Sequence, residues 1–216
     1  MNSNHLNDWL LKKKKQSLLM GILNVTPDSF SDGGQYFKKN SAVQHALKMI
    51  NEGADIIDIG GESTKPFSEP VSLDEELSRV IPVIQELRKE TDVCISIDTT
   101  KSEVANQALE NGASIINDVS AMEFDLNMID IALKFDCPII LMHMKGIPKN
   151  MQENPQYDSL ISEIISYLKD RIDFVLSKGI NRKKIFIDPG IGFGKSIEDN
   201  YKIINKLDEF TTVSYT

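Results

Sequence analysis

The chain has 216 residues, of which 41% are hydrophobic and 26% charged, so it is long and apolar enough to form a globular core. Its formal net charge of −8 argues against nucleic acid as a partner, because no general positive field is present to hold phosphates. The sequence has no run of about 18 apolar residues and no signal-peptide pattern in residues 1–17, which predicts a cytoplasmic protein without membrane contact. Cys94 and Cys137 lie in apolar runs and are expected to be buried thiols.

After an N-terminal extension over residues 1–17, short apolar runs alternate with amphipathic helical patterns. This alternation is typical of parallel strands that helices cover on both faces. No shift in composition divides the chain, so residues 18–216 are expected to form one domain. Strands are expected at 18–24, 54–61, 93–98, 113–118, 138–144 and 184–190, and helices at 41–52 (with Ser41 as the N-cap), 73–89, 102–110, 126–135, 157–177 and 197–207.

Six such β/α units fit either an open doubly wound sheet or part of an eight-stranded barrel. An open sheet binds ligands at one crevice, so only a few strand ends need polar residues, whereas all strand ends of a barrel meet at one mouth. Every expected strand carries a polar residue at or just past its end, which favours a TIM (β/α)8-type barrel. These residues are Asn24, Glu62, Asp98, Asn117, His143 and Asp188.

The last residues of the sequence, EFTTVSYT, lie where a seventh strand is expected to begin. A barrel of this type has eight β/α units in about 250 residues. About six of the eight units are therefore expected in this sequence. Two open sheet edges would then favour aggregation.

A long polar loop follows the first strand, from Asn24 to Asn40. A strand-to-helix connection needs only a few residues, and longer polar loops at the ends of buried strands tend to carry function. Asn24 offers a neutral oxygen to a cation such as Mg²⁺, which usually takes one or two protein ligands together with substrate phosphates. The second loop carries Ser63, Thr64 and Lys65, which are expected to bind an anion or to cover the mouth as a lid.

Asp98, Asn117 and Asp188 each end an apolar run. A carboxylate in such surroundings is unfavourable unless it accepts hydrogen bonds. A flat heterocycle with amino and ring N–H groups would supply these donors. The alternative is that each residue caps the following helix or binds a neighbouring loop.

The segment DPGIGFGKS (188–196) is similar to a phosphate-binding P-loop, but Pro189 stands where the first glycine is required. Its glycines are interpreted as allowing the backbone to approach a flat ligand, with Phe193 as a wall. His143 is a candidate general base, and the alternative is a hydrogen-bonded structural histidine.

Taken together, these motifs resemble the dihydropteroate synthase family over about residues 18 to 210. Segments 20–34 and 53–66 match both signature segments of that family, and SIDT (96–99), IINDV (115–119), LMHM (141–144) and DPGIGFGK (188–195) follow in its order. Methyltetrahydrofolate-type methyltransferase domains share the Asp98, Asn117 and Asp188 set but lack the NVTPDSFSDGG loop.

The resemblance implies condensation of 6-hydroxymethyl-7,8-dihydropterin diphosphate with 4-aminobenzoate, which gives 7,8-dihydropteroate and diphosphate. It implies Asn24, Asp98 and Asp188 as catalytic residues, with Asn24 also placing Mg²⁺. It assigns the pterin to Asp98, Asn117, Met142, Asp188 and Phe193, and 4-aminobenzoate, where sulfonamides compete, to Phe30, Thr64, Lys65 and Pro66.

Two departures from the family pattern matter. Lys65 stands where the family usually has arginine, which is expected to weaken a two-pronged contact with a carboxylate or phosphate. The family's Ser-Arg-Lys and Arg-x-His motifs are absent. Two hypotheses follow. The first is a synthase whose sequence here is incomplete, with a homodimer as its expected assembly. The second is a truncated, non-catalytic pterin-binding protein or a methyltetrahydrofolate-type methyltransferase pterin domain.

Overall fold

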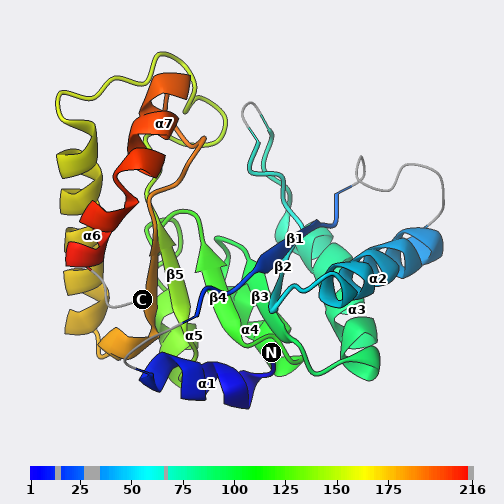
Figure 1. Cartoon of the computed structure of the whole chain (residues 1–216). Coiled ribbons are helices and arrows are strands. Elements are labelled where there is room, and N and C mark those ends of the chain that lie inside the picture. Colours follow the sequence, from blue (N-terminus) through cyan, green and yellow to red (C-terminus); the bar gives the residue numbers. More distant parts are fainter. Residues whose placement is uncertain (13–15, 27–34, 66–67, 214–216) are drawn as a thin grey trace. The chain divides into compact units, whose positions relative to one another are not determined.

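The structure, a computed structural model, describes residues 1–12, 16–26, 35–65 and 68–213 (Figure 1). The chain divides into two compact units, which are described one at a time. The first unit comprises residues 1–63 and 70–117, and the second comprises residues 64–69 and 118–216. The expectation of a single domain over residues 18–216 stays a prediction.

The first unit is built from parallel strands that alternate with helices. Each strand pairs with the next strand in the sequence, in the order β1-β2-β3-β4. The strands are β1 (Met20–Asn24), β2 (Ile56–Gly60), β3 (Cys94–Asp98) and β4 (Ile115–Asp118), and the helices are α1 (Ser3–Leu11), α2 (Gln35–Asn51), α3 (Leu73–Glu90) and α4 (Ser102–Glu110).

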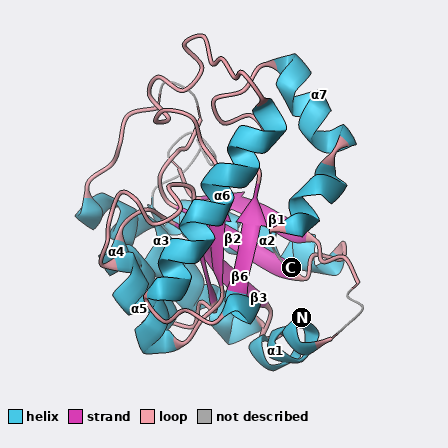
Figure 2. Cartoon of the chain, turned by 90° about the vertical axis from the view of Figure 1, so that its left-hand side faces the viewer, coloured by secondary structure: helices cyan, strands magenta, loops and turns pink. Residues whose placement is uncertain are grey.

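The second unit repeats the pattern with β5 and β6, which are parallel neighbours. Helices α6 and α7 share a buried apolar cluster that includes Ile164, Leu168 and Ile203 (Figure 2). The elements are α5 (Met128–Phe135), β5 (Ile139–Met142), α6 (Leu160–Ser177), β6 (Ile185–Asp188), α7 (Ile197–Asn205) and two 3₁₀ helices, Arg182–Lys184 and Leu207–Thr212.

The strand order within each unit decides between the two architectures that the sequence left open. A doubly wound sheet reverses its strand order at a switch point, whereas a (β/α) barrel adds each strand beside its predecessor. Both units follow the second rule. The predicted parallel α/β fold is confirmed, and the order of strands within each unit is that of the TIM-barrel type.

The core of the first unit forms where apolar strand residues meet one face of each covering helix. Ile57 and Ile59 of β2 are fully buried, as are Val80, Ile84 and Leu87 of α3. Burying one such side chain contributes roughly 1.5–3 kcal/mol to folding. Helix α3 begins at a Ser72 N-cap, followed by three acidic residues that favour the positive end of the helix dipole.

Most expected elements are found within a few residues of their predicted bounds, but the first predicted helix is wrong at its start. Helix α2 begins at Gln35, so Ser41 lies inside the helix and is no N-cap. Ala42, Val43 and Ala46 are buried there, and this packing outweighs the weak helix preference of serine. The N-terminal extension also contains a helix, α1, which the sequence analysis did not predict. Among the described residues, no helix is long and apolar enough to cross a membrane.

Candidate active site

Strand pairing in the first unit aligns four residues in one row across β1 to β4. Asn24 pairs with Gly60, Gly60 with Asp98, and Asp98 with Asn117. Parallel strands present residues of one row to the same face and at the same end, here the carboxyl end. The structure therefore brings together Asn24, Asp98 and Asn117, three of the predicted site residues.

Gly60 leaves space between the two side chains that flank it in this row. A β-carbon added at Gly60 would lie 3.2 Å from Oδ2 of Asp98 and 3.6 Å from Oδ1 of Asn24. The carboxylate of Asp98 and the amide oxygen of Asn24 thus face the same small space. Asn24 is exposed, and Asp98 and Asn117 are half-buried, so a ligand can reach all three.

Asp58 lies one layer below this row and was missed by the sequence analysis. It is two residues before Gly60, so it points to the same face of β2, and it is 4% exposed. Its Oδ2 accepts a hydrogen bond of 3.0 Å from Nδ2 of Asn117. The signal in the sequence was an acidic residue within the apolar run of β2.

A partly buried ion-pair cluster fixes the start of the second loop. Lys101 donates to Glu62 and, at 2.6 Å, to Oε2 of the fully buried Glu76. Although burial by itself lowers the pKa of Lys101, its hydrogen bonds to Glu62 and Glu76 raise it. Oε2 of Glu62 also accepts from the backbone N–H of Val71 at 3.3 Å. Glu62, at the end of the second expected strand, therefore has a structural role in this arrangement.

In the second unit, β5 and β6 place Met142 opposite Asp188. Oδ1 of Asp188 accepts from the backbone N–H of Gly190 at 2.7 Å, which starts the turn that follows β6. Burial raises the pKa of the Asp188 carboxyl. The backbone N–H of Phe193 donates to Gly190 O at 3.1 Å, and the Phe193 side chain is half-buried. Met142, Asp188 and Phe193, all predicted pterin contacts, thus belong to one strand pair and its turn.

Lys195 holds this turn against the end of β5. It is only 2% exposed, and its Nζ lies 2.9 Å from Phe193 O, 3.2 Å from His143 O and 3.0 Å from Nδ1 of His143. Burial lowers the pKa of Lys195 to about 7, against the opposing effect of the charges on Asp188 and Asp199. Because its amine is held by these three acceptors, Lys195 does not act as the lysine of a P-loop would.

His143 is 6% exposed, and its ring packs edge-on against Tyr167 with centroids 5.1 Å apart. Burial, and next the charge of Lys195, lower its pKa to about 3. The ring is therefore neutral at pH 7. When Lys195 is charged, its amine only donates, so Nδ1 accepts from it and Nε2 carries the proton. A histidine with such a low pKa is a poor general base. The geometry favours the structural interpretation of His143.

The residues assigned to 4-aminobenzoate are described only in part. Thr64 is half-buried and Lys65 is exposed. The carbonyl of Lys65 accepts from the hydroxyl of Ser68 at 2.7 Å, which closes a turn. Phe30 and Pro66 lie outside the described residues.

Cys94 and Cys137 are buried thiols, as expected, and burial raises the pKa of Cys137 to about 12. Across residues 1–12, 16–26, 35–65 and 68–213, no group of three or more His, Cys, Asp or Glu side chains is arranged to hold a metal ion. A magnesium site of the predicted kind would rest on fewer protein ligands than that.

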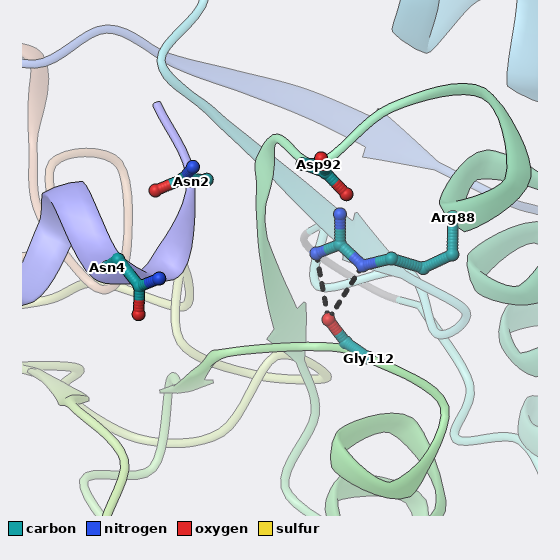
Figure 3. A pocket seen from close by; sticks show the side chains of 5 residues that line it. All are labelled: Asn2, Asn4, Arg88, Asp92 and Gly112. Atoms are coloured by element: carbon teal, nitrogen blue, oxygen red, sulfur yellow. Dashed lines mark hydrogen bonds between the residues drawn. The ribbon is translucent and has the colours of Figure 1, made fainter.

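A polar cavity of about 290 Å³ lies elsewhere in the first unit, lined by Asn2, Asn4, Arg88, Asp92 and Gly112 (Figure 3). The guanidinium of Arg88 donates to the carbonyls of Gly112, Thr91 and Val93. Val93 and Gly112 come just before β3 and β4, so this cavity is at the amino ends of the strands, opposite the polar row. In barrel folds that end serves stability, which separates this cavity from the candidate active site.

Residues 20–215 match the model of the family described as "Pterin binding enzyme". The chain is 47% identical over 211 residues to the dihydropteroate synthase of Bacillus subtilis, covering 98% of this chain and 72% of that protein. The chain belongs to the dihydropteroate synthase family.

Solved structures of this family agree with the comparison of sequences. A Yersinia pestis dihydropteroate synthase in complex with a sulfonamide drug superposes with a TM-score of 0.84 at 44% identity, covering 91% of this chain and 71% of that one. A Xanthomonas albilineans dihydropteroate synthase in complex with 7,8-dihydropteroate gives a TM-score of 0.81 at 40% identity, covering 94% and 71%. The matched part of this chain thus spans about seven tenths of the length of each of these relatives.

Proposed function

We propose that this member of the dihydropteroate synthase family condenses 6-hydroxymethyl-7,8-dihydropterin diphosphate with 4-aminobenzoate in folate biosynthesis. The observation that carries the proposal is the row of Asn24, Asp98 and Asn117, which strand register aligns at the carboxyl end of β1 to β4. The dihydropteroate complex of the Xanthomonas albilineans relative supports it, because that ligand contains both a pterin and an aminobenzoyl group.

In this proposal, Asp98 and Asn117 of the first unit and Asp188 of the second accept hydrogen bonds from the edge of the pterin. Met142 and Phe193 contact its flat faces. Each acceptor is half-buried, so its hydrogen bonds to a ligand are shielded from water and correspondingly strong. Phe30, Thr64, Lys65 and Pro66 bind 4-aminobenzoate, where sulfonamides compete.

The reaction breaks the bond between the pterin methylene carbon and the diphosphate oxygen and forms a bond from that carbon to the amine nitrogen of 4-aminobenzoate. The amine loses one proton, and diphosphate leaves with the bonding electrons. Positive charge develops on the methylene as diphosphate departs. Carboxylates that accept from the pterin N–H groups stabilise this charge through the conjugated ring, so the chain acts by orientation and electrostatics and supplies no nucleophile.

Asn24 fits a role as a magnesium ligand. Asn24 is exposed at the strand end, and its amide oxygen and the Asp98 carboxylate face the same small space at Gly60. Hard cations prefer such neutral and anionic oxygens. Magnesium, when bound, supplies positive charge to the leaving diphosphate. We also propose a cytoplasmic location and a homodimer, the latter to be tested by analytical ultracentrifugation.

The first test is the Asp98→Asn variant, with binding of 6-hydroxymethylpterin measured by isothermal titration calorimetry. The substitution removes the charge and one acceptor, so pterin affinity should fall about 10- to 100-fold, because a hydrogen bond to a charged group contributes about 1.5–3 kcal/mol. Asp130→Asn, on the exposed face of α5, is the matched control and should bind like the parent chain. Near-normal pterin affinity in Asp98→Asn would contradict the site assignment.

A second measurement separates the synthase from a non-catalytic pterin-binding protein. Diphosphate release from the dihydropterin diphosphate is followed with and without 4-aminobenzoate. Release that depends on 4-aminobenzoate is the result expected of a synthase. Pterin binding without such release would favour the non-catalytic alternative.

A further inference from the structure

The buried carboxylate of Asp58 touches a proposed ligand-binding residue and has no role in the proposed reaction itself. Asp58 lies in the middle of β2 and is 4% exposed. Its Oδ2 is 3.0 Å from Nδ2 of Asn117 on β4. Strand β3 runs between them, with Ser96 as the register partner of Asp58 and Asp98 as that of Asn117. The contact therefore crosses from the layer of Asp58 to the row above it.

This contact fixes which end of the Asn117 amide faces outward. The side chain of asparagine has a donor end and an acceptor end of nearly the same shape, and either end can face a ligand unless a neighbour selects one. An ionised carboxylate accepts hydrogen bonds and donates none. The Nδ2 group must therefore face Asp58, and the Oδ1 atom of Asn117 is left for another donor.

We propose that Asp58 is a positioning residue that sets the donor and acceptor pattern of the ligand-binding row. Holding Nδ2 of Asn117 makes the row present acceptors on two adjacent strands, the Asn117 amide oxygen and the Asp98 carboxylate. Such a pair selects a heterocycle edge with adjacent N–H donors. The amino group and neighbouring ring N–H of a 2-amino-4-oxo-pteridine have this arrangement, so the inference rests on the proposed pterin function.

A ligand with a carbonyl oxygen in place of the amino group would place that oxygen, an acceptor, against the acceptor oxygens of Asn117 and Asp98. Sites built to pair with a donor reject analogues that lack it, because the protein acceptors are left without a partner. If the side-chain amide of Asn117 could rotate by 180°, its NH₂ group would pair with that carbonyl. The discrimination between the amino and the oxo ligand would then weaken. Asp58 thus acts on ligand choice through Asn117.

Ser96 offers a matched control in the same layer. It is fully buried beside Asp58, and among the described residues its hydroxyl has no hydrogen-bond partner. It therefore does not orient Asn117, and Ser96→Ala removes one buried polar atom without changing the amide. A general disturbance of this layer should appear in both Ser96→Ala and Asp58→Asn, whereas loss of orientation should appear only in the second.

The experiment measures the dissociation constants of 6-hydroxymethylpterin and 6-hydroxymethyllumazine, its 2-oxo analogue, by isothermal titration calorimetry with the whole 216-residue chain. Asp58→Asn keeps the size of the side chain but lets either amide end face Asn117. We expect the preference of the parent chain for the pterin to fall about 10-fold or more in Asp58→Asn and to persist in Ser96→Ala. Equal losses for both ligands, or an unchanged preference, would overturn the inference.

The double variant Asp58→Asn with Asn117→Asp exchanges the two roles. Asn at position 58 then donates to Asp at position 117, whose second oxygen is an acceptor, so the preference for the pterin should return. If the role of Asp58 is purely structural, the double variant does not restore the preference. The double variant therefore still distinguishes a positioning role from a structural one if Asp58→Asn alone does not fold. Failure of the parent chain to bind either pteridine would instead remove the proposed function and this inference with it.

Discussion

The row across β1 to β4 and the turn after β6 both carry proposed ligand contacts, but they are held in place by different means. Asp98 and Asn117 belong to strands, so backbone pairing fixes their positions. Phe193 belongs to a turn, which is held by the buried amine of Lys195 and by close contact of Gly190 with His143. Substitutions in the row should therefore change ligand choice while the fold persists, whereas single substitutions in the turn should lower stability.

Gly190→Ala is expected to have the largest effect on stability. Gly190 has φ +70°, and an added β-carbon would lie 2.0 Å from the backbone oxygen of His143. That oxygen belongs to the chain at the end of β5, so the turn itself must move. The free energy of unfolding should fall by about 3 kcal/mol or more, measured by urea denaturation.

Gly192→Ala is the matched control for this substitution. Gly192 has φ +86°, but no atom of the described residues lies within 4 Å of an added β-carbon. Only the backbone strain remains, about 1–2 kcal/mol. Equal losses in the two variants would mean that the close approach of the turn to His143 is unimportant.

Lys195→Met should have the next largest effect. Methionine fills a similar volume, but it leaves the carbonyls of His143 and Phe193 and Nδ1 of His143 without their donor. Buried acceptors that lose a charged donor typically destabilise a protein by about 1.5–3 kcal/mol. Thermal unfolding should show this loss, and the affinity for 6-hydroxymethylpterin should fall as the Phe193 turn is released.

Lys206→Met serves as the control, because Lys206 is exposed and its amine donates to Glu209 at the surface. Its melting temperature should stay at the parent value, since exposed pairs contribute little. A Lys195→Met chain as stable as Lys206→Met would show that the buried amine does not hold the turn.

The contrast between the row across β1 to β4 and the turn after β6 also explains how much of the site the sequence could predict. The alternation of strands and helices and the polar residues at the strand ends were visible in the local pattern, and strand register then aligned Asn24, Asp98 and Asn117 in one row. The role of Lys195 was not visible, because its partner His143 is 52 residues away in the sequence. The irregular P-loop pattern argued against a nucleotide phosphate site but indicated no other role for this lysine.

Asp58 illustrates a second kind of limit. An acidic residue inside an apolar strand signals a buried polar contact, because an isolated buried charge is strongly unfavourable. The sequence does not say which partner satisfies it, since that depends on the register of β2, β3 and β4. The start of α2 was predicted too late for a related reason, because helix packing decided a boundary that the local serine suggested elsewhere.

At pH 7 the smallest effect on stability is expected in His143→Asn, which instead changes how stability depends on pH. The pKa of His143 is lowered from 6.5 to about 3 by burial, so between these values the unfolded chain binds a proton that the folded chain does not. His143 therefore makes the parent lose stability as pH falls from 6.5 toward 3, by up to about 1.4 kcal/mol per pH unit. Asparagine does not titrate, and its Oδ1 lies near the position of Nδ1, so it still accepts from Lys195.

Burial raises the pKa of Asp118 to about 6, which has the opposite sign: the folded chain binds this proton more tightly, and stability rises as pH falls from 6 toward 3.8. The parent curve mixes both effects with that of Asp188, whose pKa burial also raises, but the two carboxyls are common to both proteins and cancel in their difference. That difference in the free energy of unfolding, from urea denaturation at pH 7 to 4, should move in favour of His143→Asn as the pH falls. A constant difference would mean that His143 accepts a proton in the folded chain as easily as in the unfolded one, which its contact with the Lys195 cation opposes.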